Sequence, residues 1–223
     1  MIYNIAIDGP AGAGKSTIAK RVAKNLGFIY VDTGAMYRAM AGYFLDKGID
    51  VKDEDAVSKD CDNVNIMIEY KDNLQQVILN GENITSRLRT EEVANTASAV
   101  AVYPAVRKKL VELQKELAKK TSVVMDGRDI GSCVLKDAIC KIYLTASVEC
   151  RALRRMAELQ EKGVDTSLEI IKADISDRDY RDMHRDVSPL VQAEDAVYLD
   201  SSDMGIEEVT DKIISIFNEK AGK

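Results

Sequence analysis

The chain has 223 residues, of which 46% are hydrophobic and 30% are charged, so collagen-like, fibrous and wholly disordered classes are excluded. The 31 basic and 37 acidic residues give a formal net charge of −6, which disfavours a general nucleic-acid surface because affinity for the phosphate backbone depends on cationic charge. Six of the twelve arginines nevertheless lie between Arg151 and Arg185, so we expect an anionic ligand at that segment.

Short apolar runs that alternate with helical patterns predict an α/β fold. The runs are short enough for buried strands, and each ends at a polar or glycine-containing turn. The clearest helical pattern follows Pro104, where apolar residues recur at intervals of four, three and four as far as Leu117. We therefore expect a five-stranded parallel sheet with helices on both faces and ligands beyond the carboxyl ends of its strands. The expected strands are 2–7, 28–31, 122–125, 139–144 and 196–199.

A glycine-rich segment follows the first expected strand and satisfies the phosphate-loop pattern G-x-x-x-x-G-K-[ST]. Backbone N–H groups of such a turn converge on phosphate oxygens, and the positive end of the next helix attracts them. We expect Lys15 to reach the β and γ phosphates and Ser16 to ligate Mg²⁺. The nucleotide-binding residues predicted from this segment are Gly9, Pro10, Ala11, Gly12, Ala13, Gly14, Lys15, Ser16 and Thr17.

Charged side chains follow the second and third expected strands, on the same edge of the predicted sheet. Asp32-Thr-Gly-Ala-Met-Tyr-Arg38 comes after the second, and Asp126-Gly-Arg128-Asp129 comes after the third. An arginine fork suits a phosphate group, which suggests a phosphorylated acceptor. Asp126 is placed like a carboxylate that holds Mg²⁺ through water. For Arg38, an ordinary surface ion pair is the alternative.

The segment 63–90 interrupts the alternation of strands and helices. Apolar runs around Ile66 and Val77 are separated by Lys-Asp-Asn at 71–73, and Asn80-Gly81 follows the second run. Asn-Gly is the strongest short signal for a two-residue hairpin turn. The sequence therefore predicts a small antiparallel insertion.

The arginine-rich segment, 147–185, predicts a helical lid. It has two helical stretches separated by 161–165, and arginines spaced three, four or seven residues apart share a helical face. Phosphoryl transfer gains from such charges and from the exclusion of water. A solvated face paired with neighbouring aspartates is the alternative. The two sets are Arg151, Arg154 and Arg155, and Arg178, Arg181 and Arg185.

Five motifs occur in the order of one known family. They are Gly-Pro-Ala-Gly-Ala-Gly-Lys-Ser-Thr, Asp-Thr-Gly-Ala-Met-Tyr-Arg, Arg89-Thr-Glu-Glu-Val-Ala-Asn95, Asp-Gly-Arg-Asp-Ile-Gly131, and Arg178-Asp-Tyr-Arg-Asp182 followed by Ser188-Pro-Leu190. With these motifs and the insertion at 63–90, the chain resembles the bacterial cytidylate kinases, which are P-loop nucleoside monophosphate kinases.

The resemblance implies a P-loop NTPase fold in which residues 1–223 form a single kinase domain. It implies that 63–90 is the insertion that binds the nucleoside monophosphate and that 147–185 is the lid. The implied reaction transfers the γ-phosphoryl group of ATP to CMP or dCMP with Mg²⁺ and without a covalent enzyme intermediate.

The resemblance also implies roles for individual residues. Thr33, where the family often has serine, would contact the acceptor with Arg38 and Arg128. The cytosine would be read by Ser98, Arg107, Asp129 and Arg185. Asp129 suits the exocyclic amino group and Arg107 the ring acceptor, whereas the sequence alone favours helix packing for Ser98. The remaining implied roles are pentose or phosphate contacts for Arg178 and Asp182, an ATP contact for Arg154, and catalysis for Lys15, Arg128, Arg178 and Arg181.

Two other functions fit parts of the sequence. One is a kinase for another small acceptor, such as UMP, AMP or a hydroxylated metabolite. The other is an ATP-binding module that drives a conformational change in a partner protein, which would leave Arg38, Arg128 and Asp129 without a role. A GTPase is disfavoured because no N-K-x-D motif is present.

The remaining expectations concern cysteines, location and assembly. Four cysteines without a C-x-x-C pair and one histidine, His184, predict neither a zinc site nor a disulfide framework. We expect His184 to be exposed and not catalytic. The sequence has no signal-peptide pattern and no apolar run of 18 residues, so we expect a cytoplasmic monomer with no membrane or nucleic-acid partner.

Overall fold

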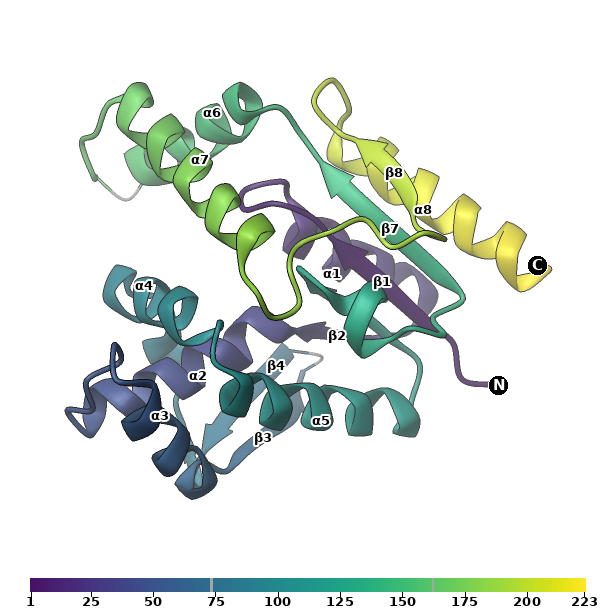
Figure 1. The fold of residues 1–223 in the computed structure, drawn as a ribbon. Coiled ribbons are helices and arrows are strands. Elements are labelled where there is room, and N and C mark those ends of the chain that lie inside the picture. Colours follow the sequence, from purple (N-terminus) through teal and green to yellow (C-terminus); the bar gives the residue numbers. More distant parts are fainter. Residues whose placement is uncertain (73, 162) are drawn as a thin grey trace. The chain divides into compact units, whose positions relative to one another are not determined.

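Residues 1–72, 74–161 and 163–223 are described by the computed structural model, which divides into two units (Figure 1). We call Met1–Tyr30 together with Thr121–Lys223 the sheet unit, and Val31–Lys120 the middle unit. Among the described residues, no helix is long and apolar enough to cross a membrane.

The main sheet has five strands in the order β2-β6-β1-β7-β8. Strand β1 runs parallel to both β6 and β7, and β7 runs parallel to β8. Each strand lies within two residues of its predicted range, which confirms the α/β class and the five-stranded parallel sheet. The strands are β1 (Asn4–Asp8), β2 (Ile29–Asp32), β6 (Val123–Gly127), β7 (Cys140–Thr145) and β8 (Val197–Asp200).

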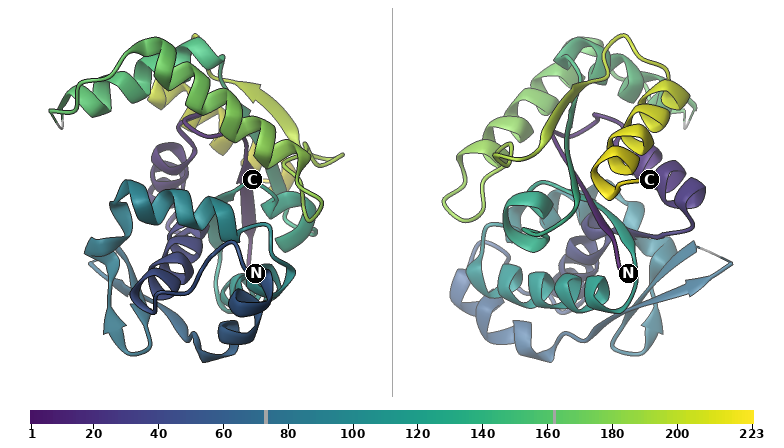
Figure 2. Two further views of the ribbon diagram at one scale, coloured as in Figure 1. Left: turned by 60° about the vertical axis from the view of Figure 1, so that its left-hand side comes forward. Right: turned by 90° about the vertical axis from the view of Figure 1, so that its right-hand side faces the viewer.

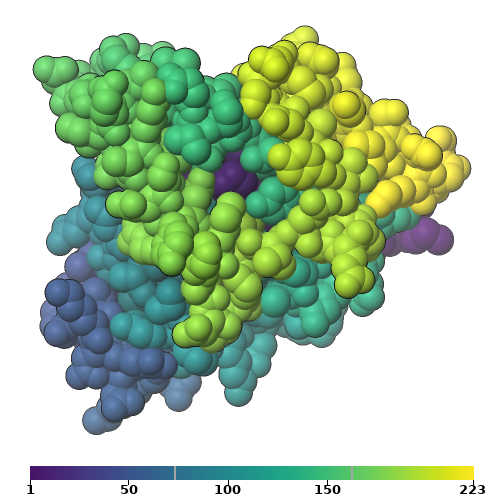
Figure 3. All heavy atoms as spheres, turned by 45° about the horizontal axis from the view of Figure 1, so that its top comes forward, coloured from purple at the N-terminus to yellow at the C-terminus, as the bar shows by residue number. Residues whose placement is uncertain are grey.

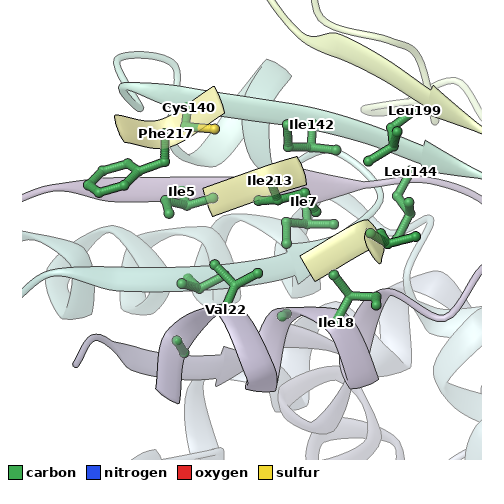
Figure 4. Packing of buried hydrophobic residues seen from close by; sticks show 14 residues of the cluster. Ile5, Ile7, Ile18, Val22, Cys140, Ile142, Leu144, Leu199, Ile213 and Phe217 are labelled. Atoms are coloured by element: carbon green, nitrogen blue, oxygen red, sulfur yellow. The ribbon is translucent and has the colours of Figure 1, made fainter. Parts of the chain in front are cut away.

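Helices α1 (Lys15–Leu26) and α8 (Ile206–Ala221) pack against one face of this sheet (Figures 1 and 4). Side chains alternate along a strand, so Ile5 and Ile7 of β1 both enter the core, where each is 0% exposed. Phe217 of α8 lies in the same core. Because this packing fixes β1 and α1, it also fixes the loop that joins them.

The sheet unit also carries a pair of helices between β7 and β8, α6 (Val148–Glu161) and α7 (Leu168–His184). They lie side by side in both views of Figure 2 and share a small core of Ala152, Ile171 and Ile175. The two helices occur where the sequence predicts the lid. Lys162, in the predicted break at 161–165, lies outside the described residues. Figure 3 shows purple N-terminal residues at the bottom of a hollow beside the green helices and the yellow-green segment near β8.

The middle unit combines helices with a small antiparallel sheet. The sheet has the order β3-β4-β5, and Ile66 of β3 pairs with Leu79 of β4. The turn at Asn80 and Gly81 has φ angles of 48° and 89°, as a type I′ hairpin turn requires. The predicted hairpins are therefore present, although Asn73 of the first predicted turn lies outside the described residues. The strands are β3 (Ile66–Lys71), β4 (Leu74–Leu79) and β5 (Glu82–Asn83).

Side chains cap several helices of the middle unit, and one helix buries a polar residue that the sequence pattern did not predict. Asp32 caps α2 and Thr90 caps α4, each accepting a backbone N–H of the first turn. The predicted helix after Pro104 is present, but Leu117 is only partly buried and Gln114 is fully buried instead. The helical elements are α2 (Thr33–Asp46), α3 (Glu54–Asp60), η1 (Cys61–Asn63), η2 (Thr85–Arg89), α4 (Glu91–Val100) and α5 (Pro104–Lys120).

Candidate active site

The phosphate loop joins β1 to α1, as the sequence predicts. Gly9 has a φ of 150°, and a Cβ on it would lie 1.9 Å from the carbonyl oxygen of Leu144 on β7, so only glycine fits. Lys15 is the first residue of α1 and is buried, and its Nζ donates to the carbonyl oxygen of Pro10 at 2.6 Å. The lysine amine therefore lies within the loop, at the positive end of α1, where an anion is favoured.

A hydroxyl and a carboxylate meet at the start of α1. The Oγ of Ser16 donates to Oδ2 of Asp126 at 2.7 Å, and the hydroxyl of Tyr30 donates to Oδ1 at 2.9 Å. Asp126 is on β6, where its register partner is Ile7 of β1, so the parallel pairing brings it to the loop. Thr17, the next residue, is exposed.

These donors suit Mg²⁺, which prefers oxygen ligands and is often bound by one or two protein groups together with phosphates and water. The described residues contain no group of three or more His, Cys, Asp or Glu side chains that could hold a metal ion by itself. A hydroxyl beside one carboxylate would therefore hold the ion only together with other oxygen ligands.

Charges around Lys15 show which groups share the site. Burial and the nearby Arg128 guanidinium lower the pKa of Lys15 well below its ordinary value, while Asp126, Asp182 and Asp8 partly counteract this shift. Phosphate oxygens would add negative charge beside Lys15, which would favour its protonated form.

Two buried ion pairs connect the end of β6 to α7 and to the residue that follows it. The Nε of Arg128 donates to Oδ2 of Asp182 at 2.7 Å, and Arg185 lies 3.5 Å from Asp129. Burial by itself would raise the pKa of Asp182, but the charges of Arg128, Arg178 and Arg185 outweigh it and hold that pKa below its ordinary value. The structure thus brings together five predicted site residues of the sheet unit: Arg128, Asp129, Arg178, Asp182 and Arg185.

The first arginine set does not form one functional face. Arg151 is buried, and Arg155 is exposed and pairs with Glu158 one turn further along α6. Arg154 donates to the carbonyl oxygen of Ser201 at 2.9 Å, and a Cβ on Gly14 would lie 3.8 Å from its Nη1. Within this set, Arg154 and Arg151 therefore lie beside the phosphate loop, whereas Arg155 forms a surface pair with a glutamate of its own helix and not with one of the aspartates of the alternative.

The remaining polar residues of α7 also differ in exposure. Arg181 is exposed, and its Nε donates to the carbonyl oxygen of Asp177 at 3.4 Å. His184 is exposed as predicted, and its ring stacks on Tyr180 with a centroid distance of 4.0 Å. Of the two predicted catalytic residues on α7, Arg178 and Arg181, Arg181 is therefore the more exposed.

The start of α2 holds predicted acceptor contacts in the middle unit. Thr33 is its first residue and is buried, and Arg38 pairs with Asp32 through an Nη2–Oδ2 contact of 3.0 Å. A Cβ on Gly34 would lie 3.1 Å from Nη1 of Arg38, so glycine leaves room for the guanidinium. The Nε of Arg38 is buried without a hydrogen-bond partner among the described residues.

Two predicted base-reading residues lie elsewhere in the middle unit. Arg107 is buried in the first turn of α5, where it donates to the carbonyl oxygen of Ala101 at 3.3 Å. Its guanidinium lies 5.9 Å from the centroid of the Tyr37 ring. Ser98 lies on α4 and is partly exposed.

Comparison with known proteins identifies the family. Residues 5–219 match the family model described as cytidylate kinase. The chain belongs to the cytidylate kinase family. It is 48% identical over 219 residues to the cytidylate kinase of Lactobacillus johnsonii, covering 98% of this chain and 95% of that protein. It is 50% identical over 211 residues to the cytidylate kinase of Oceanobacillus iheyensis, covering 95% and 92%.

A solved structure supports the fold alone. An uncharacterized protein from Eubacterium ventriosum matches with a TM-score of 0.52 and 16% sequence identity, covering 98% of this chain and 99% of that chain.

In this member of the cytidylate kinase family, sequence reasoning missed three buried charges beside the loop. Asp8 accepts the backbone N–H groups of Ile130 and Gly131 at 2.8 and 2.7 Å, at the start of the π-helical turn η3 (Ile130–Val134). Burial raises its pKa to about 6, although these two bonds oppose the shift. The sequence signal that could have identified Asp8 is its place at the end of an apolar strand, directly before Gly9.

The other two missed charges form an ion pair between α6 and α7. Arg151 of α6 lies 2.6 Å from Asp179 of α7, and both side chains are almost fully buried. Arg151 was predicted only as a member of an arginine face. Asp179 was quoted within a motif but given no role, because its spacing does not tell a buried aspartate from a solvated one.

Proposed function

We propose that this chain transfers the γ-phosphoryl group of ATP to CMP or dCMP, giving ADP and CDP or dCDP. A phosphate oxygen of the acceptor forms the new bond to the γ-phosphorus, and the bond to the bridging oxygen of ADP breaks. The acceptor phosphate is already anionic, so no side chain has to remove a proton from it.

On the donor side, the phosphate loop from Gly9 to Thr17 would bind the phosphates of ATP through its backbone N–H groups. Lys15 would contact the β and γ phosphates, and Arg154, beside Gly14, would contact the nucleotide. Ser16 and Asp126 would hold Mg²⁺, the latter through water, and the ion would neutralise phosphate charge. The hydrogen bond between these two side chains supports this assignment because it places the hydroxyl oxygen next to the carboxylate oxygen.

On the acceptor side, Arg38 and Arg128 would bind the phosphate of CMP beside Thr33. Arg178 and Asp182 would contact the pentose or the phosphate. The cytosine would be read by a carboxylate that accepts from its amino group and by donors to its ring acceptors, the residues being Asp129, Arg107, Arg185 and Ser98. The 3.5 Å pair between Arg185 and Asp129 supports this group, since a buried carboxylate needs a partner that fixes its orientation.

Catalysis would come mainly from positive charge around the transferred group. Arg128 lies close enough to Lys15 to lower the pKa of the lysine, and Arg178 lies near Asp182. Arg181 would join them only after a movement of α7, because its side chain is exposed. The segment 147–185 would supply that movement as a lid, and the antiparallel insertion at 63–90 would help to bind CMP. We expect hydrogen exchange in 147–185 to slow when a bisubstrate inhibitor binds, and unchanged exchange would contradict the lid.

The observation that carries the proposal is the match of residues 5–219 to the cytidylate kinase family. The hydrogen bond of Arg128 to Asp182 supports it. An ADP-release assay with CMP, dCMP, UMP, AMP, GMP and shikimate tests it. We expect the highest kcat/KM with CMP or dCMP. A preference for another acceptor, or ATP turnover that no acceptor accelerates, would contradict the proposal. The monomeric state stays a prediction that light scattering after gel filtration can test.

A further inference from the structure

The helices α6 and α7 contact the phosphate loop at both backbone polar groups of Ala11, through one buried ion pair. Arg151 of α6 donates from Nη1 to the carbonyl oxygen of Ala11 at 2.9 Å. Asp179 of α7 accepts the N–H of Ala11 at 3.3 Å through Oδ1, while its Oδ2 lies 2.6 Å from Arg151. Both polar groups of Ala11 are thus bonded to side chains from outside the loop.

The Arg151–Asp179 ion pair is buried and held in place by further contacts. Its two side chains are only 5% and 11% exposed, and Nε of Arg151 is held by the carbonyl oxygen of Ala146 at 2.9 Å, just before α6. A Cβ on Gly12 would lie 3.4 Å from the Cβ of Arg151, so the arginine stem also packs against the loop. Charge-assisted bonds in such a buried place are strong and strict in geometry.

We propose that Arg151 and Asp179 are positioning residues, which fix the peptide groups on either side of Ala11 so that the phosphate loop is preorganised for ATP. The inference rests on the proposed function, since it assumes that this loop binds the phosphates of ATP. Neither side chain has to touch the nucleotide: the two act through the backbone of Ala11.

The physical reason is that a phosphate loop works by the orientation of its peptide groups. The N–H of Ala11 belongs to its peptide group with Pro10 and its C=O to the peptide group with Gly12, so the ion pair holds two successive peptide groups of the loop. Rotation of the second group would reorient the N–H of Gly12. A displacement of about 1 Å at a binding group can cost about 10²-fold in activity. Arg151 lies near the start of α6 and Asp179 lies near the end of α7. The same ion pair therefore also joins these two ends of the helices.

A second ion pair between the two helices provides a matched control. Lys172 of α7 pairs with Glu149 of α6, but the two side chains are much more exposed than those of Arg151 and Asp179, at 32% and 56%. Lys172→Met removes an α6–α7 ion pair without touching the loop. If Arg151 and Asp179 served only to hold the helices together, the two pairs would behave alike.

The test is the double variant Arg151→Met with Asp179→Leu. Replacing both members of a buried ion pair with apolar side chains is often neutral for stability, whereas removing one member leaves a buried charge. We expect thermal melting close to that of the wild type. We also expect a 10- to 100-fold rise in the KM for ATP and in the ATP Kd from calorimetry, while the KM for CMP changes less than threefold. Lys172→Met should leave all three values within twofold. A folded double variant with wild-type ATP affinity would overturn the proposal.

A milder pair of variants covers the case in which the double variant does not fold. Arg151→Lys keeps the charge but loses the fork, and Asp179→Asn keeps one acceptor oxygen but loses the charge. Each should raise the ATP Kd about tenfold and shift the amide resonance of Ala11 in nuclear magnetic resonance spectra without nucleotide. An unchanged Ala11 resonance and ATP Kd would contradict the proposal. The ATP Kd is measured without CMP, so failure of this inference is distinguishable from failure of the proposed acceptor.

Discussion

Two regions of the sheet unit hold buried carboxylates by different means. At the end of β1, Asp8 accepts two backbone N–H groups, and its pKa is raised to about 6. On α7, Asp182 accepts from the Arg128 guanidinium, with Arg178 and Arg185 nearby, and its pKa is lowered. Burial disfavours the charged form in both places, so the difference lies in the partners: backbone dipoles offset burial only in part, and full positive charges more than offset it.

The difference separates a fixed part of the site from an exchangeable one. Backbone N–H groups cannot leave Asp8 without unwinding the start of η3, so this carboxylate ties the phosphate loop to the segment that carries Arg128 and Asp129. The arginine partners of Asp182 are side chains, and a phosphate can replace a carboxylate as the partner of a guanidinium. We therefore expect the charged groups on α7 to change partners during the reaction while Asp8 stays in place.

The largest effect should come from removing the exchangeable charge itself. Arg128→Ala should keep the fold but lower kcat by about 10³-fold, because the lost guanidinium would otherwise stabilise charge in the transition state. The measurement is ADP release at saturating ATP and CMP, with circular dichroism as the check on folding. A turnover within tenfold of the wild type would remove Arg128 from the mechanism.

A smaller loss should follow from neutralising the carboxylate that holds this arginine. Asp182→Asn should lower kcat/KM for CMP about 10- to 100-fold, since three arginines lose the charge that orients them. Asp174→Asn is the control, because Asp174 is an exposed aspartate on the same helix. An equal kcat/KM for the two variants would mean that the buried Asp182 beside Arg128 does not contribute to activity.

Asp8 should reveal itself through the pH dependence of stability. Its pKa is about 6 in the folded chain against an ordinary value of 3.8, so between these values the folded state binds a proton that the unfolded state lacks. Stability from this group therefore rises as the pH falls from 7.5 to 5, by about 1 kcal/mol. The lowered pKa of Asp182 acts below that range.

Urea unfolding at both pH values checks this prediction. The gain on acidification should be about 1 kcal/mol larger in the wild type than in Asp8→Asn, which cannot titrate at this position. The same gain in both proteins would show that Asp8 is not protonated near pH 6. Loss of the fold in Asp8→Asn would leave the wild-type pH dependence as the readout, with no rise toward pH 5 contradicting the assignment.

The fold and the location of the site could be predicted from the sequence because both depend on local patterns. Apolar runs located the strands to within two residues, and the motifs after them lie at strand ends, as with Asp126 after β6. The burial of charged side chains could not be predicted, because it depends on which elements pack against each helix. Arg151 and Arg155 are one turn apart on α6, yet one holds the phosphate loop and the other faces solvent.

The smallest predicted effect is that of replacing Arg155 on α6, and the neighbouring Arg154 gives the comparison. Arg155 pairs with Glu158, and their side chains are 46% and 61% exposed, so solvent and salt screen the attraction and both chains lose rotamer freedom. Arg155→Gln should change the free energy of unfolding by less than about 0.5 kcal/mol, and the KM for ATP by less than twofold. Arg154→Gln, one residue away and beside Gly14, should raise that KM severalfold. Parallel ATP titrations of the two variants make the comparison. A rise above threefold in Arg155→Gln would place this arginine at the donor site and would mean that exposure in the structure does not separate the two residues.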